Sequence, residues 1–437
     1  MNSRRQLGLG SATALVVASM IGAGVFTTSG FLLADLRSPW IVLAAWAVGG
    51  LQAMLGALCY GALARRIPES GGEYLFLSRT LHPSAGYLAG WISLLVGFSA
   101  PLAAMAYAYG RYIQPWLPGW SPAVQGTSVI LLFGVVHALQ VRGGARVQNW
   151  AVGVKVVFIL CFVGFAVTCL DRPPAEPAPS FSLPAFSVSL VWISFSYAGW
   201  NAAVYLGGEV RDPERNLPRS LLLGTGAVMV LYLALNAVFV WSAPIDQLAG
   251  KVEVGLVAGR ALGGEALERL VSLLVSLVLM SSVSSMIMAG PRVYVQMAAD
   301  GYLPRGLAAA SGPPRRAIAL QVALALVLLW SARYDSLLTW TGFTLQLSTA
   351  AAVVGLVRLR LREGRQLPVP GWPWVPGLFL LAILGTTIFC IVQRPWESLA
   401  VMVVLTAGWC AWHLHRPTSV STPVNGEPPS RSGPGRA

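Results

Sequence analysis

The sequence predicts an all-α integral membrane protein with twelve transmembrane helices, and three observations lead to this prediction. Of the 437 residues, 55% are hydrophobic and only 11% are charged, whereas a soluble domain has about 25% charged residues. Apolar runs recur along the chain at the length of roughly 20 residues that crosses about 30 Å of hydrocarbon. The basic residues gather in alternate loops between these runs, as they do in multi-pass membrane proteins.

The apolar runs define the elements in order. The twelve predicted spans are 7–33, 39–63, 81–112, 125–141, 148–170, 186–210, 218–242, 264–299, 317–332, 336–358, 374–393 and 396–415. Together they predict one transmembrane domain over residues 1–416. Residues 417–437 are rich in Pro, Ser and Gly and lack aromatic residues, which predicts a disordered cytoplasmic tail. Arg4 and Arg5 resemble the start of a signal peptide, but the apolar pattern continues past residue 30 without a small-x-small cleavage stop, which favours a retained helix.

The net charge of +13 reflects basic residues whose placement indicates how the chain is oriented in the membrane. A basic balance also occurs in nucleic-acid-binding proteins, but here its placement follows the spans, and no nucleic-acid partner is expected. With the N-terminus in the cytoplasm, twenty-one arginines fall on the cytoplasmic side and only eight basic residues fall outside. Those eight are Arg37, Arg111, Arg172, Lys251, Arg260, Arg269, Arg333 and Arg394. The pattern predicts a multi-pass protein of the cell (inner) membrane, in contact with lipid, with both termini cytoplasmic.

Motifs for enzyme chemistry do not occur in this sequence. There is no intramembrane pair of carboxylates, no His cluster, no nucleophile–base spacing and no P-loop. The sequence therefore predicts a non-enzyme without cofactor or metal, driven by gradients or exchange and not by ATP. The five cysteines all fall within predicted spans and are interpreted as small apolar packing residues.

Two predicted spans carry an interruption near the middle. In the first span, "ASMIGAGVFTTSG" (18–30) places glycines where each costs about 1 kcal/mol relative to alanine. The sixth span has a matching weak point in "WISFSYAGWNAAVYLGGEV" (192–210). The two breaks lie five helices apart, and an odd number of helices in a repeat inverts the next repeat. Paired breaks of this kind indicate a transporter binding site, although glycines also serve simply to bring helices close together.

The chemistry of such breaks suits a zwitterion. Where the first span resumes, the N–H groups of Ala23, Gly24 and Val25 are expected to lack intrahelical partners and to favour a carboxylate. Where the first half-helices stop, free carbonyls near Ile21 and near residues 195–197 are expected to favour an ammonium group. The sequence thus predicts an α-amino acid site that needs almost no charged side chains.

Several motifs resemble those of the amino acid–polyamine–organocation superfamily. "MIGAGVF" is similar to its first-helix signature, and "FSYAGWNAAVYLGGEVRDPERNLPRSL" (195–221) resembles helix 6 and the next loop of the L-type amino acid transporter branch. The stretches 56–76, 144–157 and 291–304 also resemble family segments. Ala23 stands where the family commonly has Ser, so one side-chain contact is missing and the backbone contacts remain.

The resemblance implies a leucine-transporter-like fold. Residues of about 7–170 and 186–358 would form inverted repeats with discontinuous helices 1 and 6, and about 374–415 would add two helices. Phe195 matches an aromatic gate over the substrate, and Asn201 matches a polar position that holds the unwound region or the substrate. The predicted substrate-binding residues are Ile21, Gly22, Ala23, Gly24, Phe195, Ser196, Tyr197, Gly199 and Asn201.

Lys155 is one of only two lysines and lies well inside the predicted span 148–170. An ionisable residue in a membrane span is a functional candidate, and a lysine loses its proton when it is desolvated. In the family, a lysine here takes the place of a sodium ion of sodium-coupled relatives. By that resemblance, Lys155 either carries the coupled proton or braces helix 1 as a fixed cation. The alternative is a lysine whose amino group extends to the interface.

These features predict a secondary active transporter, either a permease or an exchanger, that moves amino acids by alternating access. Lys155 is the candidate for proton coupling, with a fixed brace as its other role. An amine or polyamine exchanger is the alternative, but its substrate favours an intramembrane acid, and none occurs between residues 190 and 206. A channel or a sensor with a transporter-like fold is a further alternative. The stretch 113–126 holds no cysteine, so no disulfide-linked heavy chain is expected.

Overall fold

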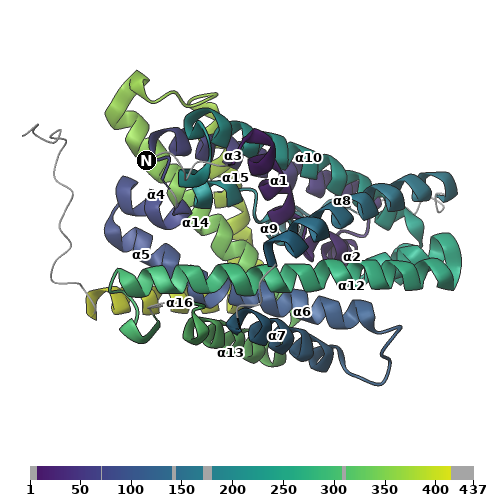
Figure 1. Cartoon of the computed structure of the whole chain (residues 1–437). Helices are drawn as coiled ribbons and strands as arrows, with labels where there is room; N and C mark the ends of the chain where they lie inside the picture. The colour runs from purple at the N-terminus through teal and green to yellow at the C-terminus, as the bar shows by residue number, and fades with distance from the viewer. Residues whose placement is uncertain (1–6, 70, 140–143, 171–179, 308–311, 415–437) are drawn as a thin grey trace, which may run out of the picture.

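The structure is a computed structural model that describes residues 7–69, 71–139, 144–170, 180–307 and 312–414. Most helices run roughly along one direction as a bundle (Figure 1). Within the described residues the β-structure is limited to an isolated bridge between Leu7 and Val210. In the part of the chain that the structure describes, seven helices are long and apolar enough to cross a membrane, and an eighth span results if one bent pair is counted. The prediction of an all-α membrane protein is confirmed.

The long spans agree closely with the predicted ones. They are α3 (Pro39–Arg66), the run α5 (Pro83–Ile92), η1 (Ser93–Gly97) and α6 (Ser99–Ile113), α10 (Pro213–Ser242), α12 (Val254–Ala299), α14 (Tyr334–Glu363) with η4 (Gly364–Gln366), α15 (Trp374–Gln393) and α16 (Pro395–Leu414). The bent pair is α1 (Leu9–Met20) and α2 (Gly24–Leu36). Within α12, Gly263 and Gly264 leave helical geometry, which separates an extra first segment from the predicted span 264–299.

Helices of 15 to 26 residues occupy the other predicted spans. They are α7 (Pro122–Ala138), α8 (Gly144–Cys169), α9 (Leu183–Tyr197) with the 3-10 helix η2 (Ala202–Glu209), and α13 (Arg315–Ser331). The connecting loops add α4 (Gly72–Thr80), α11 (Ile245–Leu248) and η3 (Arg305–Leu307), which the apolar pattern did not predict.

Local sequence explains several helix starts. Ser38, Ser121 and Ser182 each precede a helix with proline in its first turn, and each side chain accepts a backbone N–H of that turn. A serine cap satisfies an amide that has no intrahelical partner, and proline loses nothing where its missing N–H is not needed. The same three starts therefore follow from short-range sequence alone.

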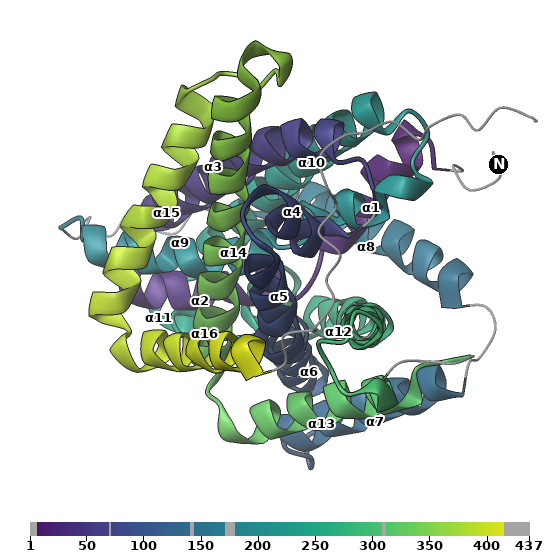
Figure 2. The same cartoon turned by 90° about the vertical axis from the view of Figure 1, so that its left-hand side faces the viewer.

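Viewed from the left-hand side of Figure 1, the bundle has a clear periphery (Figure 2). The helices α15 and α16 lie along one edge, and α7 and α13 lie along another. Leu381, Leu384 and Ile388 of α15 and Val403 of α16 are exposed. Exposed apolar side chains on outer helices are what a lipid-facing surface requires.

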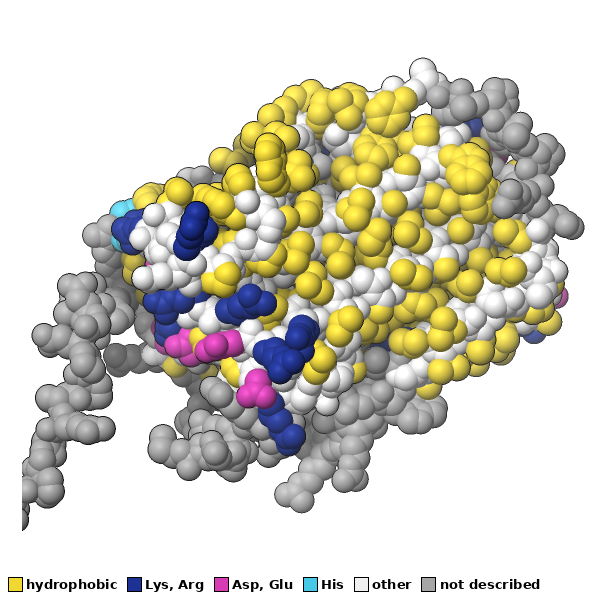
Figure 3. Space-filling model, turned by 90° about the horizontal axis from the view of Figure 1, so that it is seen from above, with side chains coloured by type: hydrophobic (Ala, Val, Ile, Leu, Met, Phe, Trp, Pro, Cys, Tyr) yellow, Lys and Arg dark blue, Asp and Glu magenta, His cyan; other side chains and the backbone are white. Residues whose placement is uncertain are grey.

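On the surface, charged side chains gather toward the ends of the molecule (Figure 3). Figure 3 shows one face on which hydrophobic side chains dominate and Lys and Arg gather at one end. Ion pairs among the described residues also lie at the two ends of the molecule. Arg66 binds Glu363 at 3.0 Å at one end, and Arg37 binds Asp246 at 2.7 Å at the other. Each pair joins residues that the charge pattern placed on the same side of the membrane.

Candidate functional site

The first span is broken where the sequence predicts. Helix α1 ends at Met20, Ile21 has the extended angles φ −74° and ψ 91°, and α2 starts at Gly24 after a bend of 44°. The residue that precedes α2, Ala23, offers no side-chain hydrogen bond to the first turn. The first amides of α2 therefore have no side-chain cap, which leaves them suited to an anionic group.

The sixth span is broken as well. Helix α9 ends at Tyr197, Ala198 is extended, and Gly199 has φ +97°. That φ lies in the left-handed region, which glycine adopts without the steric cost of a Cβ. The chain resumes only as the 3-10 helix η2 (Ala202–Glu209), a tighter form with poorer hydrogen-bond geometry that is frequent at functional hinges.

The two breaks meet each other. A Cβ at Gly24 would lie 2.4 Å from the Cα of Ser196, and one at Gly199 would lie 2.6 Å from the carbonyl oxygen of Ser19. Thr28 Oγ1 and Ser196 Oγ are also hydrogen-bonded at 2.8 Å. The start of α2 thus lies against the end of α9, while the end of α1 lies against the start of the second half of the sixth span. The two broken spans therefore run antiparallel.

Lys155 reaches the first break from α8. Its Nζ donates to the Ile21 carbonyl oxygen at 3.3 Å and to Ser282 Oγ of α12 at 3.0 Å, and the side chain is only 1% exposed. The amino group therefore does not extend to the interface. The Ile21 carbonyl, which the sequence predicts to be free, already has one partner, although a carbonyl oxygen has a second lone pair.

Polar side chains hold the half-helices in place around the breaks. The Tyr232 hydroxyl donates to the Met20 carbonyl at 2.6 Å, and the Tyr334 hydroxyl donates to Thr27 Oγ1 at 2.9 Å. Trp46 Nε1 donates to Ser29 Oγ at 2.9 Å, and Ser29 in turn donates to the Asn236 side chain. This shell supports an unwound backbone at a depth where unpaired polar groups are costly.

The predicted site residues are enclosed. Ile21, Ala23, Phe195 and Tyr197 are each 5% exposed or less. Phe195 belongs to the large cluster of buried apolar side chains that also contains Ile21 and Ala23. The Tyr197 hydroxyl donates to the Trp46 carbonyl at 3.3 Å. The structure brings both predicted clusters together and buries most of their residues, while Gly199 stays partly exposed.

One functional candidate was missed. Glu73 of α4 accepts a hydrogen bond from Asn201 Nδ2 at 2.7 Å, and it is 5% exposed. The stretch 190–206 indeed contains no acid, but an acid from a distant segment reaches it. Two glycines with positive φ, Gly71 and Gly72, precede Glu73 and permit the tight entry into α4. That Gly-Gly-Glu sequence is the signal by which the residue could have been found.

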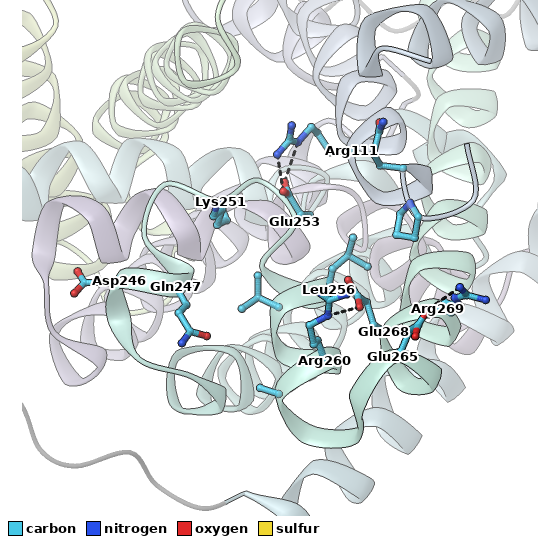
Figure 4. A pocket seen from close by; sticks show the side chains of 14 residues that line it. Arg111, Asp246, Gln247, Lys251, Glu253, Leu256, Arg260, Glu265, Glu268 and Arg269 are labelled. Carbon is cyan, nitrogen blue, oxygen red and sulfur yellow. Dashed lines mark hydrogen bonds and ion pairs between the residues drawn. The ribbon is translucent and has the colours of Figure 1, made fainter. Parts of the chain in front are cut away.

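A pocket of about 770 Å³ opens at the end of the molecule opposite α4, beside the end of α6, α11 and the start of α12 (Figure 4). Its charged residues form pairs: Arg111 with Glu253 at 2.6 Å, Arg260 with Glu268 at 2.7 Å, and Arg269 with Glu265 at 2.6 Å. Arg111, Lys251, Arg260 and Arg269 all belong to the eight basic residues predicted outside, and here they line one cavity.

Comparison with known proteins agrees with this geometry. A family model described as "Amino acid permease" matches residues 7–409. The chain is 26% identical to the b(0,+)-type amino acid transporter 1 of Mus musculus, over 94% of this chain and 88% of that protein. It is 27% identical to the human large neutral amino acids transporter small subunit 2, over 82% and 70% of the two chains.

A bacterial relative is equally similar. The chain is 26% identical to the serine/threonine exchanger SteT of Bacillus subtilis, over 88% of this chain and 90% of that protein. These matches confirm the resemblance to the amino acid–polyamine–organocation superfamily and its L-type branch. Because the family model covers most of the sequence, and because the two predicted helix breaks are present and in contact, this chain belongs to the amino acid permease family of membrane transporters.

Proposed function

We propose that this protein is a secondary active transporter that carries α-amino acids across the cell membrane by alternating access. The observation that carries the proposal is the contact between two broken spans, at Gly24 and Ser196. The substrate carboxylate would bind the uncapped amides of Ala23, Gly24 and Val25. Its ammonium group would bind the second lone pair of the Ile21 carbonyl and the last carbonyls of α9.

We further propose a twelve-span architecture with two inverted repeats of five helices. The antiparallel contact of the two broken spans supports it, since equivalent helices of inverted repeats run in opposite directions. The helices α7, α8, α9 with η2, and α13 would supply the spans beyond the eight that length and composition identify. The N-terminus and the tail 417–437 would be cytoplasmic; the tail lies outside the described residues.

Phe195 and Asn201 are proposed to close the site from its two sides. Phe195 is buried beside the α9 end, where an aromatic ring would cover a bound substrate. Asn201 follows the second break and bonds to Glu73, which supports a role in holding the unwound segment. Gly24 and Gly199 supply the close approach of backbone that the site requires, whereas Gly22 faces the Met105 side chain.

Lys155 has two candidate roles in this cycle. Its contact with Ile21 supports a fixed cation that braces the first break. A lysine that releases its proton would instead couple transport to a proton gradient.

The alternative of an amine or polyamine exchanger gains one supporting observation, because Glu73 places an acid next to the second break. That acid already accepts hydrogen bonds from protein donors, which favours a structural or gating role. A substrate panel separates the two functions. Each amino acid would be paired with the amine that lacks its carboxylate, so that only the group proposed to bind α2 differs.

The function is tested by uptake into proteoliposomes that contain the purified protein. Labelled α-amino acids should enter saturably and stereoselectively, and internal unlabelled amino acid should accelerate entry. The decarboxylated amines should compete at least tenfold less well. Equal competition by the amines would overturn the amino acid assignment, and non-saturable flux would indicate a channel.

A further inference from the structure

A buried carboxylate links the first connecting loop to the second half of the sixth span. Glu73 lies in the first turn of α4, between the long helices α3 and α5, and is 5% exposed. No role is assigned to it by the substrate site described above. Its surroundings place it beside η2, whose far end lies next to the start of α1. This is the inner end of the molecule under the proposed orientation.

Three neutral donors surround this carboxylate. Tyr60 of α3 donates its hydroxyl to Glu73 Oε1 at 2.8 Å, and Asn201 donates Nδ2 to the same oxygen at 2.7 Å. Tyr205 of η2 donates its hydroxyl to Oε2 at 3.0 Å. The side chain therefore joins α3, α4 and the broken sixth span in one cluster. Among the described residues, no ion pair includes Glu73, so hydrogen bonds alone offset its burial.

The backbone on either side is equally close. A Cβ at Gly72 would lie 2.3 Å from the Tyr205 ring, and one at Gly207 would lie 2.7 Å from the Pro68 carbonyl oxygen. The far end of η2 is held by Leu7, whose N–H donates to the Glu209 carbonyl at 3.1 Å. Any movement of η2 away from the loop before α4 must therefore break the hydrogen bonds that Asn201 and Tyr205 donate to Glu73.

From this placement we propose that Glu73 is the latch of the inner gate, and that its carboxyl group binds a proton when the latch is closed and releases it when the gate opens. The latch holds η2 against α3 and α4, and opening exposes the carboxyl group to water. In the protonated form Oε2 carries the hydrogen and donates it to the Tyr205 hydroxyl, while Oε1 still accepts from Tyr60 and Asn201. The inference rests on the proposed transport function and adds a proton site to it, separate from Lys155.

The electrostatics give the sign of this coupling. Burial raises the pKa of Glu73 above its usual range, and the hydrogen bonds from Tyr60, Tyr205 and Asn201 oppose that rise without cancelling it. A hydrated carboxyl group in the open gate returns toward its ordinary pKa. The closed latch therefore binds the proton more tightly, so falling pH favours closure and rising pH favours opening.

Other titratable groups near the latch are neutral or already paired. Tyr60 and Cys59 face it from α3, and Tyr205 faces it from η2. Several charged and polar groups of the surrounding loop and of α14 form pairs of their own. These are Arg79 with Glu69, Tyr74 with Asp300, Arg66 with Glu363, and Arg358 with the Leu81 carbonyl.

The test compares Glu73→Gln with Glu69→Gln in proteoliposomes of the full-length protein. Glutamine keeps the shape of the latch but binds no proton, and Glu69 is an exposed acid of the same loop. Wild-type protein and Glu69→Gln should accumulate labelled amino acid in response to an inward proton gradient. Glu73→Gln should lose at least tenfold of that accumulation, while exchange of labelled for unlabelled amino acid stays within about threefold.

Two results would overturn the latch. One is gradient-driven accumulation by Glu73→Gln at the wild-type level. The other is a wild-type protein that exchanges amino acids but ignores the proton gradient, which would leave the proposed function standing. Loss of exchange by wild-type protein would instead contradict the proposed function itself.

A second variant keeps the test decisive if Glu73→Gln fails to fold. Tyr60→Phe retains the acid and two of its three hydrogen-bond partners. Because the lost hydrogen bond favours the charged form, the pH midpoint of uptake should move to higher pH. A pH profile identical to that of the wild type would contradict the proton site.

Discussion

At the residue scale, the site depends on two positions where only glycine fits and on one buried lysine. Gly24 faces the Cα of Ser196, and Gly199 combines φ +97° with close contact to the Ser19 carbonyl. Lys155 is the other essential residue, because its amino group is the donor to the Ile21 carbonyl. The broken backbone is tolerated because the two glycines lack a Cβ and because the Lys155 amino group is present.

Gly24→Ala is expected to abolish the contact between the broken spans. Its Cβ would lie 2.4 Å from backbone that cannot move aside easily, and overpacking of this kind costs about 1–3 kcal/mol. Uptake should fall at least tenfold and the melting temperature should drop. Gly10→Ala is the control, because a Cβ there meets nothing within 4 Å; equal behaviour of the two variants would argue against the site.

At the element scale, half-helices α1, α2, α9 and the 3-10 helix η2 replace two continuous spans. Each is held by side chains from other helices: Tyr232 of α10 binds the end of α1, Tyr334 of α14 binds α2, and Lys155 of α8 binds between them. The break in the first span is thus a junction of several elements, which explains how an apolar bundle keeps unwound backbone in place.

Lys155→Met tests this junction. Methionine has a similar length but leaves the Ile21 carbonyl without its amino-group donor, and an unpaired buried acceptor costs roughly 1–3 kcal/mol. Uptake should fall at least tenfold, whereas Lys251→Met, at the other and exposed lysine, should behave as wild type. Gradient-driven accumulation that survives in Lys155→Met would rule out proton coupling through this residue.

Lys155→Arg then separates the two roles that the contact allows. An arginine keeps its proton at all accessible pH values, so it retains the charge of a brace but cannot release a proton. Retained exchange together with lost response to a proton gradient would assign the coupling role. Retention of both would assign the fixed brace.

At the scale of the whole molecule, charge and apolar surface divide it into two polar ends and a lipid-facing middle. The ion pairs of the described residues each stay at one end, and the pocket near Arg111 lies at the end opposite the Glu73 latch. A transporter that alternates its access needs a closable structure at each end, with the site between them. The enclosed residues around Ile21 and Phe195 correspond to a closed arrangement.

Orientation is the prediction that belongs to this scale. Single cysteines at Lys251 and at Arg365, in a background without the native cysteines, should react differently with a membrane-impermeant maleimide applied to intact cells. Position 251 should be labelled and position 365 only after permeabilisation, because the excess of arginines lies inside. The reverse pattern would invert the proposed topology and place Glu73 at the outer gate.

The sequence by itself determined the span positions and the two breaks. These features depend on short stretches of sequence, so they can be recognised without the tertiary structure. They are the length of the apolar runs, the serine–proline helix starts, and the glycines near residues 22–24 and 199. Their spacing of five helices also indicated that the breaks belong together. The family resemblance then added Phe195 and Asn201 as candidates.

Only the tertiary structure decided which distant groups meet. Lys155 and Ile21 are 134 residues apart, and Glu73 and Asn201 are 128 residues apart. The Ile21 carbonyl was expected to be free, and Glu73 had no expected role, because hydrogen bonds across the bundle depend on how the helices pack. Local composition fixes where a membrane helix weakens, whereas the packing of remote helices fixes what stabilises it there.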